Sequence, residues 1–211
     1  MCPRTAPRAL TKVKFVLGLE TGQWHVWVME TVKCSHSRVV CTLAALSLLF
    51  AVGARGADTK PAFGTGDKAP AFQAKTTDGK TVNFPTDYKG KVVLLDFWAT
   101  WCPPCRAEVP NVVAAYQKLH SRGFEVLGVS LDQANASEKL ASFAKDNRMS
   151  WPQVFDGKYW KAEIAQKYSI HSIPRPILVD GDTGIILADG KEARGENLAP
   201  AVEKALAAKK K

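Results

Sequence analysis

Apolar positions recur with two different spacings from about residue 70 to the C-terminus. Short continuous or alternating runs predict strands, and apolar residues three or four apart predict helices. The predicted strands are 71–75, 81–84, 91–98, 124–131, 151–155, 176–179 and 185–188. The predicted helices are 102–122, 137–147, 159–168 and 196–208. Strands that alternate with helices, followed by a strand pair and a closing helix, indicate an α/β layered domain.

Three local patterns refine this prediction. Asp78-Gly79 lies between the first two strands and favours a hairpin turn. The run 91–98 is almost entirely apolar, which is typical of a central strand buried on both faces. Pro110 falls inside the predicted helix 102–122, so we expect a kink there, and Gly123 is suited to cap its C-terminus.

The N-terminal region has the order of a secretory signal. Residues 39–52 carry no charge, and Lys33 and Arg38 precede them. The segment 53–57 that follows has small residues at every position but Arg55. The run is shorter than the ~20 apolar residues that span a bilayer as a helix. We therefore expect 29–56 to be a signal peptide cleaved after Gly56, which would place the protein in the periplasm. An uncleaved anchor that faces the periplasm is the alternative.

Residues 1–28 precede this signal and show no clear periodicity. Met29 would start a signal peptide of ordinary length, so we expect 1–28 to be a non-native leader extension that arises from a misplaced start codon. N-terminal sequencing of the unprocessed protein tests this expectation, because residues found before Met29 would contradict it. A long basic leader with no separate function is the alternative.

The remaining chain divides into a polar linker, 57–68, and one domain, 69–211. The formal net charge is +9, but seven of the 29 basic and two of the 20 acidic residues lie in 1–56, which leaves +4. The basic residues are not interleaved with aromatic ones, so we expect no nucleic-acid partner. We expect a monomer.

The candidate chemistry is in Trp101-Cys102-Pro103-Pro104-Cys105, directly after the apolar run 91–98. A helix N-terminus lowers the pKa of a thiol there, and a second cysteine one turn on can attack a mixed disulfide formed by the first. The chain has five cysteines, and cleavage after Gly56 would remove three of them, Cys2, Cys34 and Cys41. Cys102 and Cys105 would then be the only pair in the exported protein.

A structural disulfide or half of a zinc site is the alternative for this pair. A four-ligand zinc site needs two more ligands, and the only histidines after residue 56 are His120 and His171. Neither has a second candidate ligand next to it in the sequence. We therefore expect no metal and no cofactor.

The stretch from Asp96 to Cys105 resembles the active-site stretch of thioredoxins, and Pro110 and Ile173-Pro174 match their helix kink and cis-proline loop. The hairpin, the inserted segment 136–168 and the export signal are similar to those of TlpA/ResA-like extracytoplasmic thiol-disulfide oxidoreductases. The resemblance implies a thioredoxin-like fold with an N-terminal β-hairpin, a central αβ insertion and helices on both faces of a mixed sheet.

The resemblance also implies roles for the residues that match. Cys102 would be the exposed nucleophile, and Cys105 the more buried resolving cysteine of a redox-active disulfide. Asp96 lies in an apolar strand, where burial raises the pKa of a carboxyl group and lets it accept the proton of Cys105. The alternative is that the Asp96 carboxylate accepts a hydrogen bond from a neighbouring donor and has no catalytic role.

The expected substrate-binding residues are Trp101, Ile173 and Pro174, with Pro174 in the cis form and the backbone of Ile173 free to pair with an extended substrate. The chain departs from its relatives at Arg175 and Pro176. We expect Arg175 to point into solvent. Pro176 lacks an N–H, so the next strand should start late or lose a ladder bond.

These implications together predict an exported reductase of protein disulfides that serves cytochrome c maturation and draws electrons from a membrane thiol-disulfide donor. A thiol peroxidase of the same superfamily is one alternative, although the stretch before Cys102 lacks the Pro-x-x-x-Thr pattern. A copper-handling module and a non-catalytic interaction domain are the others. Peroxide consumption, copper titration and disulfide reduction by a Cys102→Ser variant distinguish them.

Overall fold

The computed structural model describes residues 63–209. The predicted leader extension, the signal peptide and the first half of the linker, 57–62, lie outside this range. The strands are β1 (Phe72–Lys75), β2 (Thr81–Phe84), β3 (Val92–Trp98), β4 (Phe124–Ser130), β5 (Gln153–Phe155), β6 (Arg175–Asp180) and β7 (Ile186–Asp189). The α-helices are α2 (Pro103–Leu119), α3 (Ser137–Asp146), α4 (Glu163–Lys167) and α5 (Leu198–Lys209).

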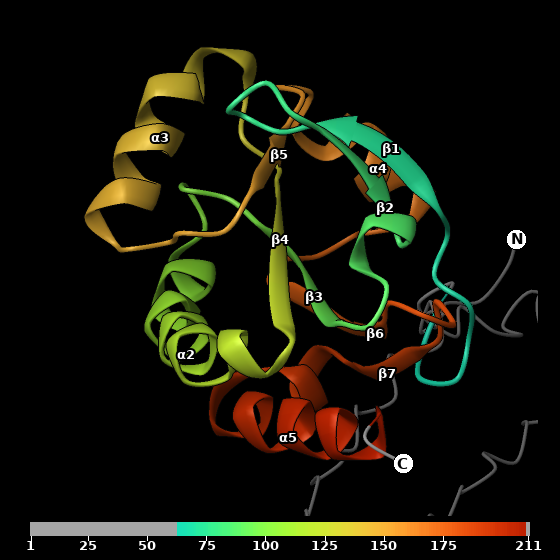
Figure 1. Ribbon diagram of the computed structural model, residues 1–211. Coiled ribbons are helices and arrows are strands. Elements are labelled where there is room, and N and C mark those ends of the chain that lie inside the picture. Colours follow the sequence, from blue (N-terminus) through green and yellow to red (C-terminus); the bar gives the residue numbers. More distant parts are fainter. Residues whose placement is uncertain (1–62, 210–211) are drawn as a thin grey trace, which may run out of the picture. The chain divides into compact units, whose positions relative to one another are not determined.

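Five strands form a mixed sheet in the order β5-β4-β3-β6-β7. β4 runs parallel to β3 and β5, whereas β6 runs antiparallel to β3 and β7. β1 and β2 form a separate antiparallel hairpin, which reaches the sheet through a bridge between Thr76 and Val154. α2 and α5 lie side by side along one side of the sheet, and α4 lies with the hairpin on the other side (Figure 1). The predicted arrangement of hairpin, insertion and mixed sheet is confirmed.

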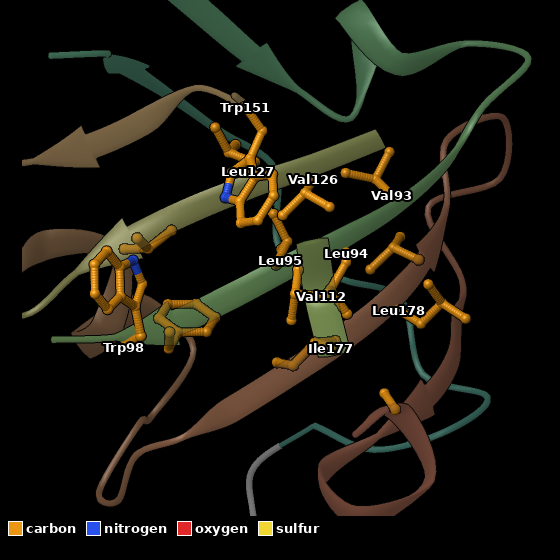
Figure 2. Packing of buried hydrophobic residues seen from close by; sticks show 14 of the residues in the cluster. Val93, Leu94, Leu95, Trp98, Val112, Val126, Leu127, Trp151, Ile177 and Leu178 are labelled. Carbon is orange, nitrogen blue, oxygen red and sulfur yellow. The ribbon is translucent and has the colours of Figure 1, made fainter. Parts of the chain in front are cut away.

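β3 is the centre of the core, and all seven of its residues are buried. Successive side chains of a strand point to opposite faces, so Phe97, which packs on Tyr168 at the end of α4, faces away from Asp96. Figure 2 shows Leu94 and Leu95 among the buried side chains of the neighbouring strands, and Val112 of α2 belongs to the same cluster. The near-continuous apolar run therefore places β3 between two packed layers, as predicted.

The segment 159–168 does not form the single helix that its apolar spacing predicts. Tyr159–Lys161 is a 3₁₀ helix and α4 begins only at Glu163. Ala162 between them has an extended ψ of 131°, and Tyr159 has a left-handed φ of 57°. Both conformations interrupt the helical hydrogen-bond pattern.

The remaining differences lie at element ends. The last turn of the predicted helix 102–122 is a 3₁₀ helix, His120–Arg122, which Gly123 caps with a φ of 103°. β6 begins at Arg175, so the prediction that Pro176 delays the strand is wrong. The fixed φ of proline suits extended backbone, and only its missing N–H affects the ladder. α2 continues through Pro110, and the kink there stays a prediction.

A membrane-spanning helix needs about 20 apolar residues. None of the helices within residues 63–209 is both long and apolar enough to cross a bilayer.

Candidate active site

Cys102 and Cys105 lie where β3 ends and α2 begins, and they form a disulfide with an S–S distance of 2.10 Å. Cys102 is the N-cap residue of α2, and its Sγ accepts a hydrogen bond from the N–H of Cys105 at 3.2 Å. Pro103 and Pro104 occupy the first helical positions, where a missing N–H costs nothing because it would have no helical partner. The sequence therefore starts the helix at the cysteine, and one free N–H of the first turn points at Sγ.

Both cysteines are buried, with exposed fractions of 3% for Cys102 and 2% for Cys105. The expectation that Cys102 is exposed is therefore wrong for this disulfide form, and Cys105 is less exposed than Cys102 by only one percentage point. The loop before β6 covers Cys102, because the carbonyl oxygen of Ile173 lies 3.9 Å from its Sγ.

This covering loop contains a cis peptide bond between Ile173 and Pro174, as predicted. Both residues are half-buried. β6 follows the loop directly and pairs with β3, which leads to the cysteines, so the topology brings the loop to the disulfide. A second cis bond, Phe84–Pro85, was not predicted.

Asp96 is a buried residue of β3, opposite Pro176 of β6. Burial, together with the smaller effect of the negative charge of Glu108 on α2, raises the pKa of its carboxyl group to about 7. A hydrogen-bond donor to the carboxylate would lower this pKa instead. The raised pKa therefore favours a proton-accepting Asp96 over one that is satisfied by a neighbouring donor.

Glu108 is a charged neighbour of Asp96 that sequence reasoning did not assign to the site. Its Oε2 accepts the N–H of Gly195 at 2.9 Å, and its Oε1 lies 3.6 Å from Nε of Arg194. A signal was present in the sequence, since Glu108 lies three residues after Cys105 and therefore on the same side of the helix.

Asp132 is a second residue that sequence reasoning missed. It is 1% exposed and follows β4. Its carboxylate accepts hydrogen bonds from the N–H of Thr100 at 3.0 Å, the hydroxyl of Thr100 at 2.6 Å and the hydroxyl of Ser130 at 2.8 Å. Asp132 therefore fixes the turn before Cys102. Parallel strands end at the same edge of a sheet, and this rule could have linked Asp132 to the motif.

The two tryptophans around the motif differ in exposure. Trp98 is 1% exposed, and its Nε1–H donates to Oε1 of Gln153 at 3.0 Å. Trp101 is 36% exposed, and its Nε1–H donates to the carbonyl of Leu131 at 3.1 Å. Trp101 thus presents an orientated aromatic surface beside the disulfide.

Arg175 does not point into solvent as expected. Its Nη2 lies 2.6 Å from Oδ2 of Asp189 on β7, and both side chains are about one-fifth exposed. The ion pair forms because β6 and β7 are neighbours. Arg175 therefore links the end of the cis-proline loop to the adjacent strand.

Within residues 63–209, no group of three or more His, Cys, Asp or Glu side chains could hold a metal ion.

Comparison with known proteins gives a consistent result. The model of the AhpC/TSA family matches residues 65–188. The thiol-disulfide oxidoreductase ResA of Bacillus thuringiensis subsp. konkukian (strain 97-27) is 31% identical over 141 residues, which are 67% of this chain and 76% of the relative. ResA of Oceanobacillus iheyensis is 39% identical over 143 residues, which are 66% of this chain and 71% of the relative.

Solved structures agree with these relatives. The thioredoxin domain of a thiol-disulfide oxidoreductase from Bacteroides vulgatus matches with a TM-score of 0.60 and 34% identity, over 69% of this chain and 99% of that chain. A thiol:disulfide interchange protein from Bacteroides sp. matches with a TM-score of 0.57 and 35% identity, over 68% of this chain and 90% of that chain. The chain therefore belongs to the AhpC/TSA family, has a thioredoxin-like fold and is a thiol-disulfide oxidoreductase.

Proposed function

We propose that this protein is an exported reductase of protein disulfides, in which Cys102 is the nucleophile and Cys105 the resolving cysteine. The observation that carries the proposal is the position of Cys102 as N-cap of α2, with its Sγ 3.2 Å from the N–H of Cys105. An N–H donor and the positive end of the helix dipole both favour a thiolate over a thiol.

In the first step, the Cys102 thiolate of the reduced protein attacks one sulfur of a substrate disulfide. A bond forms between Cys102 and that sulfur, the substrate S–S bond breaks, and the other substrate sulfur leaves as a thiolate. The attack depends on the thiolate fraction, so a lowered pKa of Cys102 accelerates the step near neutral pH.

In the second step, Cys105 loses its proton and attacks the sulfur of Cys102. The mixed disulfide breaks, the second substrate thiolate leaves, and the Cys102–Cys105 disulfide forms. Asp96 is the proton acceptor in this proposal. With a pKa of about 7 it is partly ionised near neutral pH and can both take and return a proton.

The substrate binds across Trp101 and the cis-proline loop. The carbonyl of Ile173 is 3.9 Å from Sγ of Cys102, which is close enough for an extended chain paired with Ile173 to bring its own sulfur to the nucleophile. Main-chain pairing of this kind tolerates many sequences, which suits an enzyme that acts on protein disulfides.

Each turnover oxidises the pair, so another dithiol must return two electrons. Together with the apolar segment 39–52, the resemblance to TlpA/ResA-like proteins supports an extracytoplasmic location and a membrane thiol-disulfide donor. The proposed substrates include the haem-attachment Cys-x-x-Cys-His segment of c-type cytochromes, which must be reduced before haem is attached.

A Cys105→Ser variant tests the proposal, because it can complete the first step but not the second. Expressed with its signal in a host that makes c-type cytochromes, it should accumulate mixed disulfides through Cys102, identified by mass spectrometry. The Cys102→Ser variant is the matched control and should trap at least about tenfold less, since the helix-capped thiol is absent.

Trapped apocytochrome would support the cytochrome role, and a set of other exported proteins would restrict the proposal to general reduction. If the Cys105→Ser variant traps no more protein than the Cys102→Ser variant, the proposed reductase function is wrong.

A further inference from the structure

A groove runs beside the redox motif, on the side of Trp101 that faces the insertion. Its volume is about 450 Å³, and its aromatic side is formed by Trp101 and Tyr159. Gln133, Asn135 and Lys139 line the polar side. A space of this size accommodates a large side chain together with part of a peptide backbone.

The aromatic side of the groove joins the motif to the insertion. The ring centroid of Trp101 lies 5.1 Å from that of Tyr159 and 5.9 Å from that of Trp160, at tilted angles typical of favourable aromatic pairs. Among residues 63–209, Trp101 is the only large hydrophobic residue that is exposed. An exposed aromatic ring in a concave site is characteristic of a recognition surface.

The loop that carries Tyr159 is held in place by close backbone contacts. A Cβ on Gly157 would lie 2.7 Å from Cα of Ala134, so the two loops touch at a position that only glycine fits. The N–H of Tyr159 donates to the carbonyl of Asp132 at 3.3 Å, and the Asp132 carboxylate holds Thr100. Asp132 therefore holds both the loop of Tyr159, which lines the groove, and the turn before Cys102.

From this geometry, and resting on the proposed reductase function, we infer that the Trp101–Tyr159 groove binds the substrate segment beside the reacting cysteine. Its occupant is an extended chain with a large aromatic or aliphatic side chain next to that cysteine, seated between the two rings. The side-chain amides of Gln133 and Asn135 are suited to bonds with the backbone of this chain. Tyr159 is then a specificity-determining residue supplied by the insertion.

The test compares reduction of short peptide disulfides that place Trp, Leu or Ser directly beside the cysteine, using the reduced full chain. Acid-quenched samples resolved by mass spectrometry give each rate constant. We expect the Trp and Leu peptides to react at least about threefold faster than the Ser peptide, because they bury apolar surface in the groove.

Tyr159→Asn removes the ring but suits the left-handed φ of 57°, and it should bring this ratio close to one. Tyr159→Phe keeps the ring and should keep the ratio, which checks the inference without relying on a less stable variant. Tyr116→Asn is the matched control, since Tyr116 is also a half-buried aromatic residue but packs on Trp151 away from the groove, and should keep the ratio.

A wild-type ratio of one, or an unchanged ratio in Tyr159→Asn, overturns the inference while peptide reduction itself upholds the reductase. If no peptide is reduced and the Cys105→Ser variant traps nothing, the proposed function fails and the inference fails with it.

Discussion

At the scale of single residues, two buried carboxyl groups of the site, Asp96 and Asp132, differ in their hydrogen-bond partners and in their charged neighbours. Asp132 is buried but fully engaged as an acceptor for Thr100 and Ser130. Asp96 is also buried, and burial together with the charge of Glu108 raises its pKa to about 7. The first carboxylate therefore has a positioning role, and the second is the one suited to proton transfer near neutral pH.

The raised pKa of Asp96 makes stability depend on pH. Between about pH 4 and pH 7 the folded protein holds a proton that the unfolded chain releases, so the free energy of unfolding falls as pH rises through this window. Above pH 7 both states are ionised and the loss, at most about 4 kcal/mol, is complete. Asp96→Asn should remove this dependence in the oxidised protein.

Urea unfolding of both oxidised proteins at about pH 5 and about pH 8 measures the effect. Asp96→Asn should also slow the reduction of substrate disulfides by the dithiol. If wild type and variant show the same change in unfolding free energy between the two pH values, Asp96 does not have the raised pKa.

The sequence predicted the residues whose chemistry is local and missed those whose partners are distant. Cys102 and Cys105 are visible from their spacing, and Asp96 stands out in an apolar strand. Asp132 and Glu108 bond to Thr100 and Gly195, which lie 32 and 87 positions away. Only the strand order and the packing of α5 beside α2 bring these partners together.

At the scale of elements, the insertion between β4 and β6 was the least predictable part. Its apolar spacing suggested one helix over 159–168, but the backbone of Tyr159 is tied to Asp132 and adopts a left-handed conformation. The strands β2 and β3 and the start of α2, in contrast, match the predicted ranges within one residue. Local periodicity predicts an element well where tertiary contacts do not override it.

A substitution at Gly157 tests whether the close contact between its loop and Ala134 stabilises the insertion. Gly157→Ala should destabilise the protein by about 2–4 kcal/mol, because it combines an unfavourable left-handed φ of 71° with a clash on the Ala134 backbone. It should also displace Tyr159 and weaken the preference for large side chains. Thermal unfolding and the peptide rates measure the two effects.

Gly79→Ala is the matched control, since Gly79 has a φ of 84° but open space around its Cβ position. It should cost only about 1 kcal/mol and leave the preference for large side chains unchanged. Equal destabilisation by the two variants would contradict the close approach at Gly157.

At the scale of the whole molecule, the strand order assembles the site. β3 lies between β4 and β6, so its C-terminal end, where α2 begins, meets Asp132 from one neighbour and the Ile173–Pro174 loop from the other. Trp101 then connects this centre to the insertion. The fold thus brings Cys102, which we propose as the nucleophile, together with Asp132, the Ile173–Pro174 loop and Trp101 at one edge of the sheet.

The direction of exchange is the central claim, and the reduction potential of the Cys102–Cys105 pair tests it most directly. The full chain is equilibrated in dithiothreitol or glutathione redox buffers and the fraction oxidised is followed by tryptophan fluorescence, with Cys105→Ser as the control that cannot form the disulfide. A reductase requires a potential closer to about −270 mV than to about −120 mV. A value near −120 mV, that of a strong oxidant, would contradict the account.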